Sequence, residues 1–248
     1  MTLNPEVGAA LAEDAATLAL LHDRELTPSV LAALKEAGFP ANLGLFPAGE
    51  ASLAGFEMMR AALASLPVVP DAALLDELAA DFAAIYLTGS FGASPCESYW
   101  LSDDHLVCQD AMFDLRALYA EQGLAVPDWR KRPDDHLVFQ LQFLARRFNA
   151  AVIADDWRAL AGFLDYHLLR WLPQFAGRVV DRCNMMFYAA LAVLTNAWLQ
   201  QVRDLIADQL GEPRPSREEI EASLGSQREA EPAAVPIAFV PGAAGPSW

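Results

Sequence analysis

Apolar residues recur along most of the chain at intervals of three or four, the spacing that lines them up on one face of an α-helix. One such stripe consists of Leu137, Leu141, Leu144 and Phe148. No segment alternates apolar and polar residues over the length of a β-strand, and the sequence contains no internal repeat. The pattern therefore predicts an all-α fold.

Local signals place the ends of the predicted helices. Thr27 followed by Pro28 is a typical helix start, Gly38 is a typical end, and residues 216–219 form a capping-box pattern. We expect helices over residues 7–22, 28–37, 49–66, 71–87, 106–122, 133–148, 155–171, 178–210 and 217–224. Pro173 is expected to break or kink the chain.

Residues 1–224 are predicted to form a single helical-bundle domain, and residues 225–248 an extended or flexible C-terminal tail. The tail is rich in proline and alanine, a composition that does not fold alone. Its apolar stretch at residues 235–240 is expected either to dock in a groove of the domain or to remain an untethered linker.

The charge balance narrows the kinds of partner. Of the 248 residues, 33 are acidic and 17 are lysine or arginine, which gives a net charge of −16. A surface of that charge repels nucleic acid and anionic lipid and favours cationic partners. Because 54% of the residues are hydrophobic, the chain has enough apolar material for a large core.

Cysteine usage and the start of the chain indicate a soluble, cytoplasmic protein. The three cysteines include no CxxC pair, which favours a reducing compartment over a disulfide framework. Residues 1–6 carry no basic region of a secretory signal. The longest nearly uncharged run, residues 183–202, contains several polar amides and is expected to be a buried core helix rather than a membrane span.

The sequence carries no strong catalytic motif. It lacks the GxSxG, P-loop, GxGxxG and HExxH patterns of common enzyme classes. His105 and Cys108 stand three residues apart, a spacing at which one helix presents both to a metal ion, and His136 is a third candidate ligand. The plainer interpretation is a surface histidine and a buried cysteine. Cys96 has no neighbouring histidine in sequence to activate it as a nucleophile.

Two short motifs bracket the middle of the chain. They are Pro95-Cys96-Glu97-Ser98-Tyr99-Trp100 and Pro133-Asp134-Asp135-His136-Leu137. A loop that ends in the first motif and a helix that opens with the second are expected to face each other across one groove. Each motif alone also has a structural explanation, because acidic residues are ordinary in the first turn of a helix and aromatic residues are ordinary in a core.

In order and spacing, these motifs and a third block at residues 163–175 resemble the TorD/DmsD/NarJ family. The resemblance covers about residues 71–210. It implies an all-helical, cytoplasmic chaperone of the TorD-like type for molybdenum-cofactor oxidoreductases. Such chaperones bind the apo-enzyme, often through its twin-arginine leader peptide, and assist cofactor insertion before export. The resemblance implies no enzymatic activity, and we expect the chain to carry no cofactor of its own.

The resemblance also implies where the leader peptide binds. The predicted peptide-binding residues are Phe82, Tyr86, Pro95, Glu97, Ser98, Tyr99, Trp100, Asp134, Asp135, His136 and Gln140. Their chemistry suits the ligand, because carboxylates pair with guanidinium groups and aromatic rings contact the apolar part of a leader. Family members usually carry an acidic residue where this chain has Gln140 or Gln142, which leaves the client open.

Two alternatives to this function stay open. A NarJ-like member assembles a molybdoenzyme subunit that is not exported, and it recognises a remnant leader. The more remote alternative is a metal-dependent enzyme that uses His105, Cys108 and His136. In the family-based hypotheses the partner is an apo-molybdoenzyme, and the chain itself is expected to be a monomer or a domain-swapped dimer.

Overall fold

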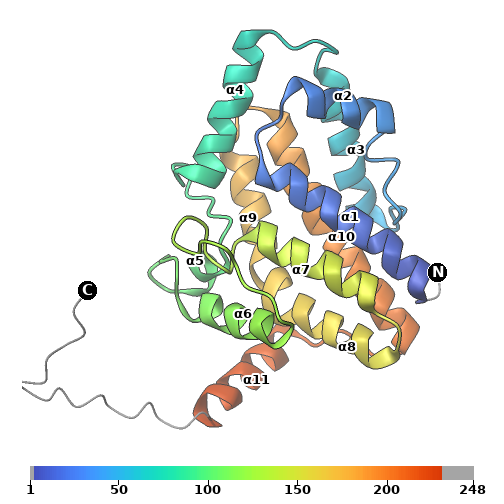
Figure 1. Ribbon diagram of the computed structural model, residues 1–248, viewed down its shortest axis with the longest axis vertical. Coiled ribbons are helices and arrows are strands. Elements are labelled where there is room, and N and C mark those ends of the chain that lie inside the picture. Colours follow the sequence, from blue (N-terminus) through green and yellow to red (C-terminus); the bar gives the residue numbers. More distant parts are fainter. Residues whose placement is uncertain (1–2, 231–248) are drawn as a thin grey trace, which may run out of the picture. The chain divides into compact units, whose positions relative to one another are not determined.

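The computed structural model describes the backbone of residues 3–230 and the side chains of residues 3–224. The described residues divide into two units, one that ends at Arg214 and one that begins at Pro215. All regular elements of the described residues are helices (Figure 1), so the predicted all-α fold is confirmed. The apolar tail stretch at residues 235–240 lies outside the described residues.

The first unit contains α-helices and two short π-helical turns, labelled η1 and η2. They are α1 (Pro5–Asp23), α2 (Pro28–Ala37), α3 (Glu50–Ser65), α4 (Ala72–Phe82), η1 (Ala83–Leu87), α5 (Glu97–Leu101), α6 (Asp110–Glu121), α7 (Leu137–Ala150), α8 (Ala154–Phe163), η2 (Leu164–Leu168), α9 (Leu169–Arg182) and α10 (Met186–Leu210). The second unit contains α11 (Arg217–Ala230).

Helix ends that carry a strong local signal lie where the sequence predicts them. The side chain of Thr27 accepts a hydrogen bond from the backbone N–H of Val30 and caps α2. Gly38 ends the same helix in the left-handed conformation, with φ of 71°. At α11, Ser216 and Glu219 each accept a hydrogen bond from the other's backbone N–H, which confirms the capping box.

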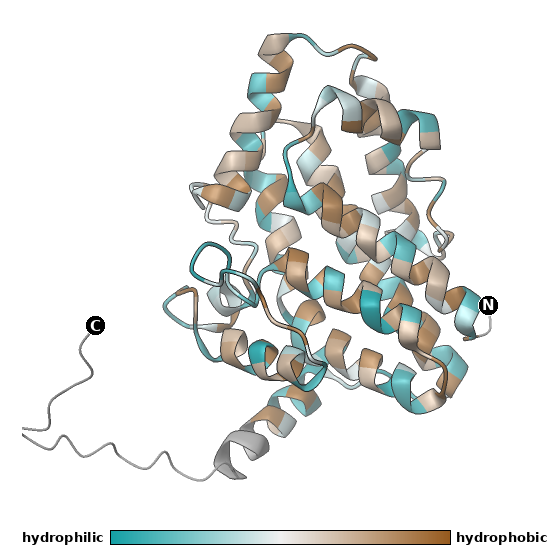
Figure 2. Cartoon of the chain, in the orientation of Figure 1, coloured by the Kyte–Doolittle hydropathy of each residue, from teal (hydrophilic) through white to brown (hydrophobic). Residues whose placement is uncertain are grey.

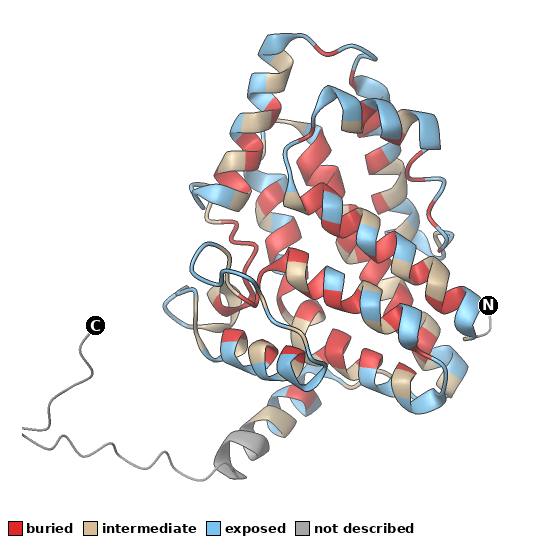
Figure 3. Ribbon diagram, viewed as in Figure 1, coloured by how far each residue is buried: buried red, intermediate tan, exposed pale blue. Residues whose placement is uncertain are grey.

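Helix α10 forms the centre of the first unit. It is buried along most of its length and packs against α3, α8 and α9 (Figures 2 and 3). Helix α1 lies along α7 (Figure 1). Their close approach requires Gly8, because a Cβ atom there would lie 2.5 Å from the backbone oxygen of Phe148. None of the described helices has the length and apolarity needed to cross a membrane.

The predicted single helix over residues 178–210 is wrong, because the chain breaks between α9 and α10. The cause is the buried carboxylate of Asp81 at the end of α4. Its Oδ2 accepts hydrogen bonds from the backbone N–H groups of Asn184 at 2.9 Å and Met185 at 2.6 Å. Met185 is the N-cap of α10 and Asn184 precedes it, so a carboxylate at this position is favoured both by these hydrogen bonds and by the dipole of α10.

The expectation at Pro173 is only partly right, since the helix does not break there. Helix α9 continues through the proline to Arg182. The π turn η2 lies immediately before α9. A proline removes one backbone hydrogen bond and crowds the carbonyl four residues earlier, so we attribute the change in helical winding upstream to that crowding.

Two further helix starts differ from prediction, and both flank the candidate site. Helix α6 begins at Asp110 rather than at residue 106. Residues His105 and Cys108 have φ of 53° and 59°, a left-handed conformation that a right-handed helix excludes. Helix α7 begins at Leu137, with His136 as its N-cap, so residues 133–135 precede the helix rather than opening it.

Candidate functional site

The two sequence motifs are joined directly by backbone hydrogen bonds. Cys96 and His136 form an isolated antiparallel β-bridge. On either side of it, the N–H of Glu97 donates to the carbonyl of Asp135 at 3.1 Å, and the N–H of Leu137 donates to the carbonyl of Pro95 at 2.7 Å. The motifs therefore meet, as expected, but the predicted open groove between them is wrong.

The side chains of the second motif cap the helices that begin at this junction. Asp135 Oδ2 accepts a hydrogen bond from the backbone N–H of Ser98 at 2.8 Å and so satisfies one free amide in the first turn of α5. His136 Nδ1 accepts from the N–H of Val138 at 3.2 Å in the first turn of α7. The proton of the neutral imidazole is then on Nε2. Burial lowers the pKa of His136 well below its usual range, with the Arg132 charge adding to the effect.

Most of the predicted peptide-binding residues are buried. The buried members are Phe82, Pro95, Glu97, Ser98, Asp134, Asp135, His136 and Gln140, whereas Tyr86, Tyr99 and Trp100 are partly exposed. Glu97 is only 1% exposed and Asp135 is fully buried. A buried carboxylate is costly unless it is paired and hydrogen-bonded, so the partners of these groups decide what the site can do.

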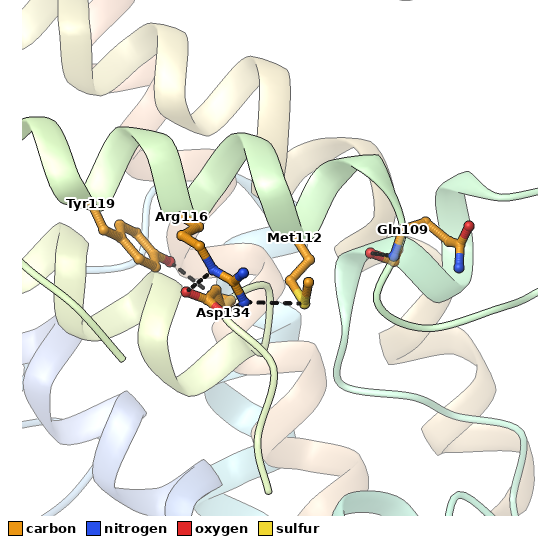
Figure 4. Close-up of polar contacts among 6 residues, drawn as sticks. Gln109, Met112, Arg116, Tyr119 and Asp134 are labelled. Atoms are coloured by element: carbon orange, nitrogen blue, oxygen red, sulfur yellow. Dashed lines mark hydrogen bonds and ion pairs between the residues drawn. The ribbon is translucent and has the colours of Figure 1, made fainter. Parts of the chain in front are cut away.

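Asp134 is held by Arg116, which reaches it from α6 (Figure 4). Arg116 Nε donates to Oδ1 at 3.2 Å and Nη2 donates to Oδ2 at 2.8 Å, a two-point fork. This carboxylate raises the pKa of the Arg116 guanidinium. Tyr119, one turn further along α6, donates its hydroxyl proton to the backbone carbonyl of Asp134 at 3.3 Å. The N–H of Gln109, just before α6, donates to Ser98 Oγ at 3.2 Å and ties α6 to α5.

Glu97 is paired on one side only. His167 belongs to the turn η2, and its Nδ1 lies 3.0 Å from Glu97 Oε1. The other oxygen, Glu97 Oε2, has no hydrogen-bond partner among the described residues, and the same is true of Asp135 Oδ1, Gln140 Oε1 and His136 Nε2. Three of these four atoms are acceptors, so the junction has more acceptors than the described part of the chain satisfies.

Burial raises the pKa of Asp135, and the nearby charge of Glu97 raises it further. The hydrogen bond from Ser98 opposes that shift. The raised pKa of Asp135 and the unsatisfied oxygens occur together because burial removes these groups from solvent, and the neighbouring carboxylate of Glu97 adds to the shift of the pKa. Arrangements of this kind are typical of functional positions rather than of ordinary core packing.

Aromatic side chains cover the rim of the junction. Trp100 donates its indole N–H to the carbonyl of Ser94 at 2.8 Å, and Arg178 lies 5.8 Å from the centre of its ring. The ring of Tyr99 stacks on His105 at 5.0 Å. Tyr99 and Trp100 therefore offer apolar surface next to the buried carboxylates.

Phe82 and Tyr86 belong to a different aromatic group. Tyr86 contacts Phe82, with ring centres 4.8 Å apart, and also packs near Tyr188. Thr195 donates its hydroxyl to a helix carbonyl, so it accepts from His22 Nε2, and Tyr86 then donates to His22 Nδ1 at 2.6 Å. Burial lowers the pKa of His22 to about 3, so this histidine is neutral.

The residues of the metal hypothesis are not arranged as a metal site. Across the described residues, no three histidine, cysteine, aspartate or glutamate side chains gather in positions that could hold a metal ion. The His105 ring bonds to the backbone of Tyr99 at 2.9 Å, and His136 caps α7. Cys96 is buried, and burial raises the pKa of its thiol well above the usual range, which suppresses the thiolate that a nucleophile requires.

Sequence reasoning missed Arg116, Tyr119 and the pairing of His167 with Glu97. Arg116 had a weak signal, since it is a single cation one turn before Tyr119 on an otherwise acidic amphipathic segment. Nothing in the sequence indicates that it reaches Asp134, because that contact spans a loop whose path sequence patterns do not predict.

Comparison with known proteins gives consistent matches. A profile described as nitrate reductase delta subunit matches residues 51–177, about half of the chain, which includes both motifs and His167. A protein named chaperone protein TorD from Psychrobacter sp. is 30% identical over 203 residues, which cover 76% of this chain and 87% of the relative.

Two further relatives of the same name match shorter segments. The one from Shewanella sp. strain ANA-3 is 32% identical over 170 residues, covering 66% of this chain and 76% of the relative. The one from Vibrio cholerae serotype O1 is 32% identical over 132 residues. That alignment covers half of this chain and 60% of the relative, less than two thirds of its length.

Proposed function

Because the chain belongs to the TorD-like family of chaperones, which the nitrate reductase delta subunit profile describes, we propose that it assists maturation of a molybdenum-cofactor oxidoreductase. Members of this family are named as chaperones, not as enzymes. The chain binds the apo-form of its client in the cytoplasm and engages the client's twin-arginine leader peptide. It holds the client until the molybdenum cofactor is inserted.

The observation that carries the leader-binding proposal is the set of unsatisfied acceptors at the motif junction. Glu97 Oε2, Asp135 Oδ1 and Gln140 Oε1 are buried without a donor from the described residues. A guanidinium group has five N–H donors, a planar shape and a permanent positive charge. One leader arginine satisfies several of these acceptors at once, and such charge-assisted bonds are the stronger kind.

The apolar part of a leader requires a second kind of contact. Tyr99 and Trp100 lie beside the buried carboxylates and are partly exposed, so they supply that contact as a leader enters. Entry requires α5 to move away from α7, since Glu97 and Asp135 are buried while the two motifs remain bonded. Helix α5 has only five residues, which makes it the smaller body to displace.

The acidic chain also attracts a basic leader from a distance. A net charge of −16 raises the rate of encounter with a cationic peptide, and salt screens the effect over a length of about 8 Å at physiological ionic strength. We expect leader affinity to fall as sodium chloride is raised from 50 to 500 mM, mainly through a slower association rate.

The proposal is tested by calorimetric titration of the purified chain with two synthetic peptides. One carries two adjacent arginines followed by an apolar segment, and the other replaces both arginines with lysine. The arginine peptide is expected to bind at least about tenfold more tightly, because lysine does not form the two-point contact. Equal affinities, or no binding of either peptide, would contradict leader recognition by this site.

The NarJ-like alternative draws on the name of the matching profile, which refers to a nitrate reductase subunit. In that case the client is not exported, and its remnant leader lacks the arginine pair. Titration with a remnant leader decides between the two, since a NarJ-like chain binds it more tightly than the twin-arginine peptide. Purification of the chain from its own cells, followed by mass spectrometry, then identifies which precursor accompanies it.

A further inference from the structure

The Arg116–Asp134 pair has an exposed side and a hidden side. The side chain of Arg116 is 37% exposed, whereas that of Asp134 is 4% exposed. A ligand that approaches this surface therefore meets the guanidinium group first and reaches the carboxylate only by taking its place. Glu97, another buried carboxylate at the junction, is bound by a histidine that is itself mostly buried.

Two aromatic rings flank the guanidinium of Arg116. Its central carbon lies 5.4 Å from the centre of the Phe113 ring and 5.0 Å from that of the Trp129 ring. Both rings are largely exposed for aromatic residues, at 54% and 38%. Beside the guanidinium, Met112 Sδ lies 3.9 Å from Nη2 (Figure 4). A carboxylate fork and flanking aromatic rings are the features that select a planar cation.

We propose that Asp134, Phe113 and Trp129 form a receptor for a client arginine, and that Arg116 occupies this receptor until the client arginine displaces it. The inference rests on the proposed function and adds a second arginine-binding position to it. One leader arginine meets the acceptors of Glu97 and Asp135, and the other replaces Arg116.

Exchange of one guanidinium group for another preserves the contacts of Asp134. The buried carboxylate is never left without a cation, so the exchange avoids the cost of an unpaired buried charge. A client lysine gains less from the same position, because it offers one point of contact where Arg116 offers two. A ligand must therefore compete with Arg116 for Asp134, which favours arginine over lysine and lowers the affinity for both.

The test substitutes Arg116→Lys, which keeps the charge but weakens the fork to Asp134. The arginine peptide described above is expected to bind about tenfold more tightly to this variant than to the unaltered chain. The matched control is Arg132→Lys, since Arg132 also pairs with an aspartate, Asp23, and lies 5.7 Å from the centre of the Phe139 ring. The control is expected to leave affinity unchanged. Unchanged or weaker binding to the Arg116→Lys variant would overturn the inference.

A second measurement uses the unaltered chain and so does not depend on the folding of a variant. In a chain labelled with ¹⁵N at arginine, the Nε–H of Arg116 is bonded to Asp134 and is expected to exchange slowly with water. Saturation with the arginine peptide is expected to release it and make its exchange fast. An Arg116 signal that stays protected in the complex would overturn the inference while leaving the proposed function intact. Absence of any peptide binding would instead contradict the proposed function.

Discussion

Two substitutions of Asp135 test whether its negative charge or its hydrogen bond stabilises the folded chain. Asp135→Asn keeps an oxygen that accepts from the Ser98 amide and removes the negative charge. We expect the free energy of unfolding to stay within about 1 kcal/mol of that of the unaltered chain, or to rise, because a buried charge is removed without loss of a hydrogen bond.

Asp135→Ala is expected to behave differently. It removes the charge-assisted bond to Ser98, worth about 1.5–3 kcal/mol, and leaves a buried amide without an acceptor. The expected loss is about 3 kcal/mol. For a chain of this length that corresponds to a fall of about 6–12 °C in the midpoint of thermal unfolding.

The pH dependence of stability provides a further check on the same group. Burial raises the pKa of Asp135 above its ordinary value of 3.8, so the folded chain binds this proton more readily than the unfolded chain does. The contribution of Asp135 to the free energy of unfolding is therefore highest below pH 3.8, and it is lost as the pH rises through the pKa of the folded state. The stability of Asp135→Asn relative to the unaltered chain should increase over that interval and then level off.

Urea unfolding followed by circular dichroism at several pH values measures the free energies of unfolding of both variants and of the unaltered chain, together with their pH dependence. An Asp135→Asn variant as unstable as Asp135→Ala would refute the reasoning, because it would show that the charge itself holds the junction together. A stability difference independent of pH would likewise contradict the raised pKa.

Four other substitutions test the fold by urea unfolding. Asp81→Ala removes the acceptor of the two amides just before α10 and should cost about 3 kcal/mol. A loss under about 1 kcal/mol would show that the break between α9 and α10 does not depend on this carboxylate. Tyr86→Phe leaves His22 Nδ1 without its donor and should cost about 1–2 kcal/mol, so an unchanged midpoint would contradict the assigned hydrogen bond. Gly8→Ala should destabilise the chain, because its Cβ would lie 2.5 Å from a backbone oxygen of α7. The control is Gly177→Ala, whose Cβ would have no atom of another element within 4 Å and which should be neutral or stabilising by up to about 1 kcal/mol. Equal effects of the two substitutions would contradict the close packing of α1 on α7.

The sequence predicted those helix ends whose cause lies within a few residues. Thr27 and Gly38 bound α2 because their capping contacts are local. The end of α9 has a distant cause, since Asp81 lies about a hundred residues upstream of the amides it binds. Periodicity continues across that break, because the residues on both sides are apolar and buried. A pattern of hydrophobic positions carries no information about such a long-range cap.

The candidate site was likewise predicted in part. The motifs indicated that residues 95–100 and 133–137 come together, and the structure places them in direct contact. The burial of the acidic residues could not be predicted, because aspartate and glutamate are exposed in most proteins and are buried only when other groups pair with them. The start of α7 was predicted too early, because acidic residues such as Asp135 are typical of the first turn of a helix. In the structure Asp135 precedes α7, and its carboxylate caps α5.

The most direct test of leader recognition is a double-mutant cycle between Asp135→Asn and a leader peptide in which one arginine is replaced by glutamine. Binding free energies of the four combinations are measured by calorimetry, and each arginine is tested in turn. We predict a coupling energy of about 1.5–3 kcal/mol between Asp135 and one of the two arginines, the range for a charge-assisted hydrogen bond. A coupling energy near zero for both arginines would show that the leader does not reach this carboxylate, and it would contradict the proposed mode of binding.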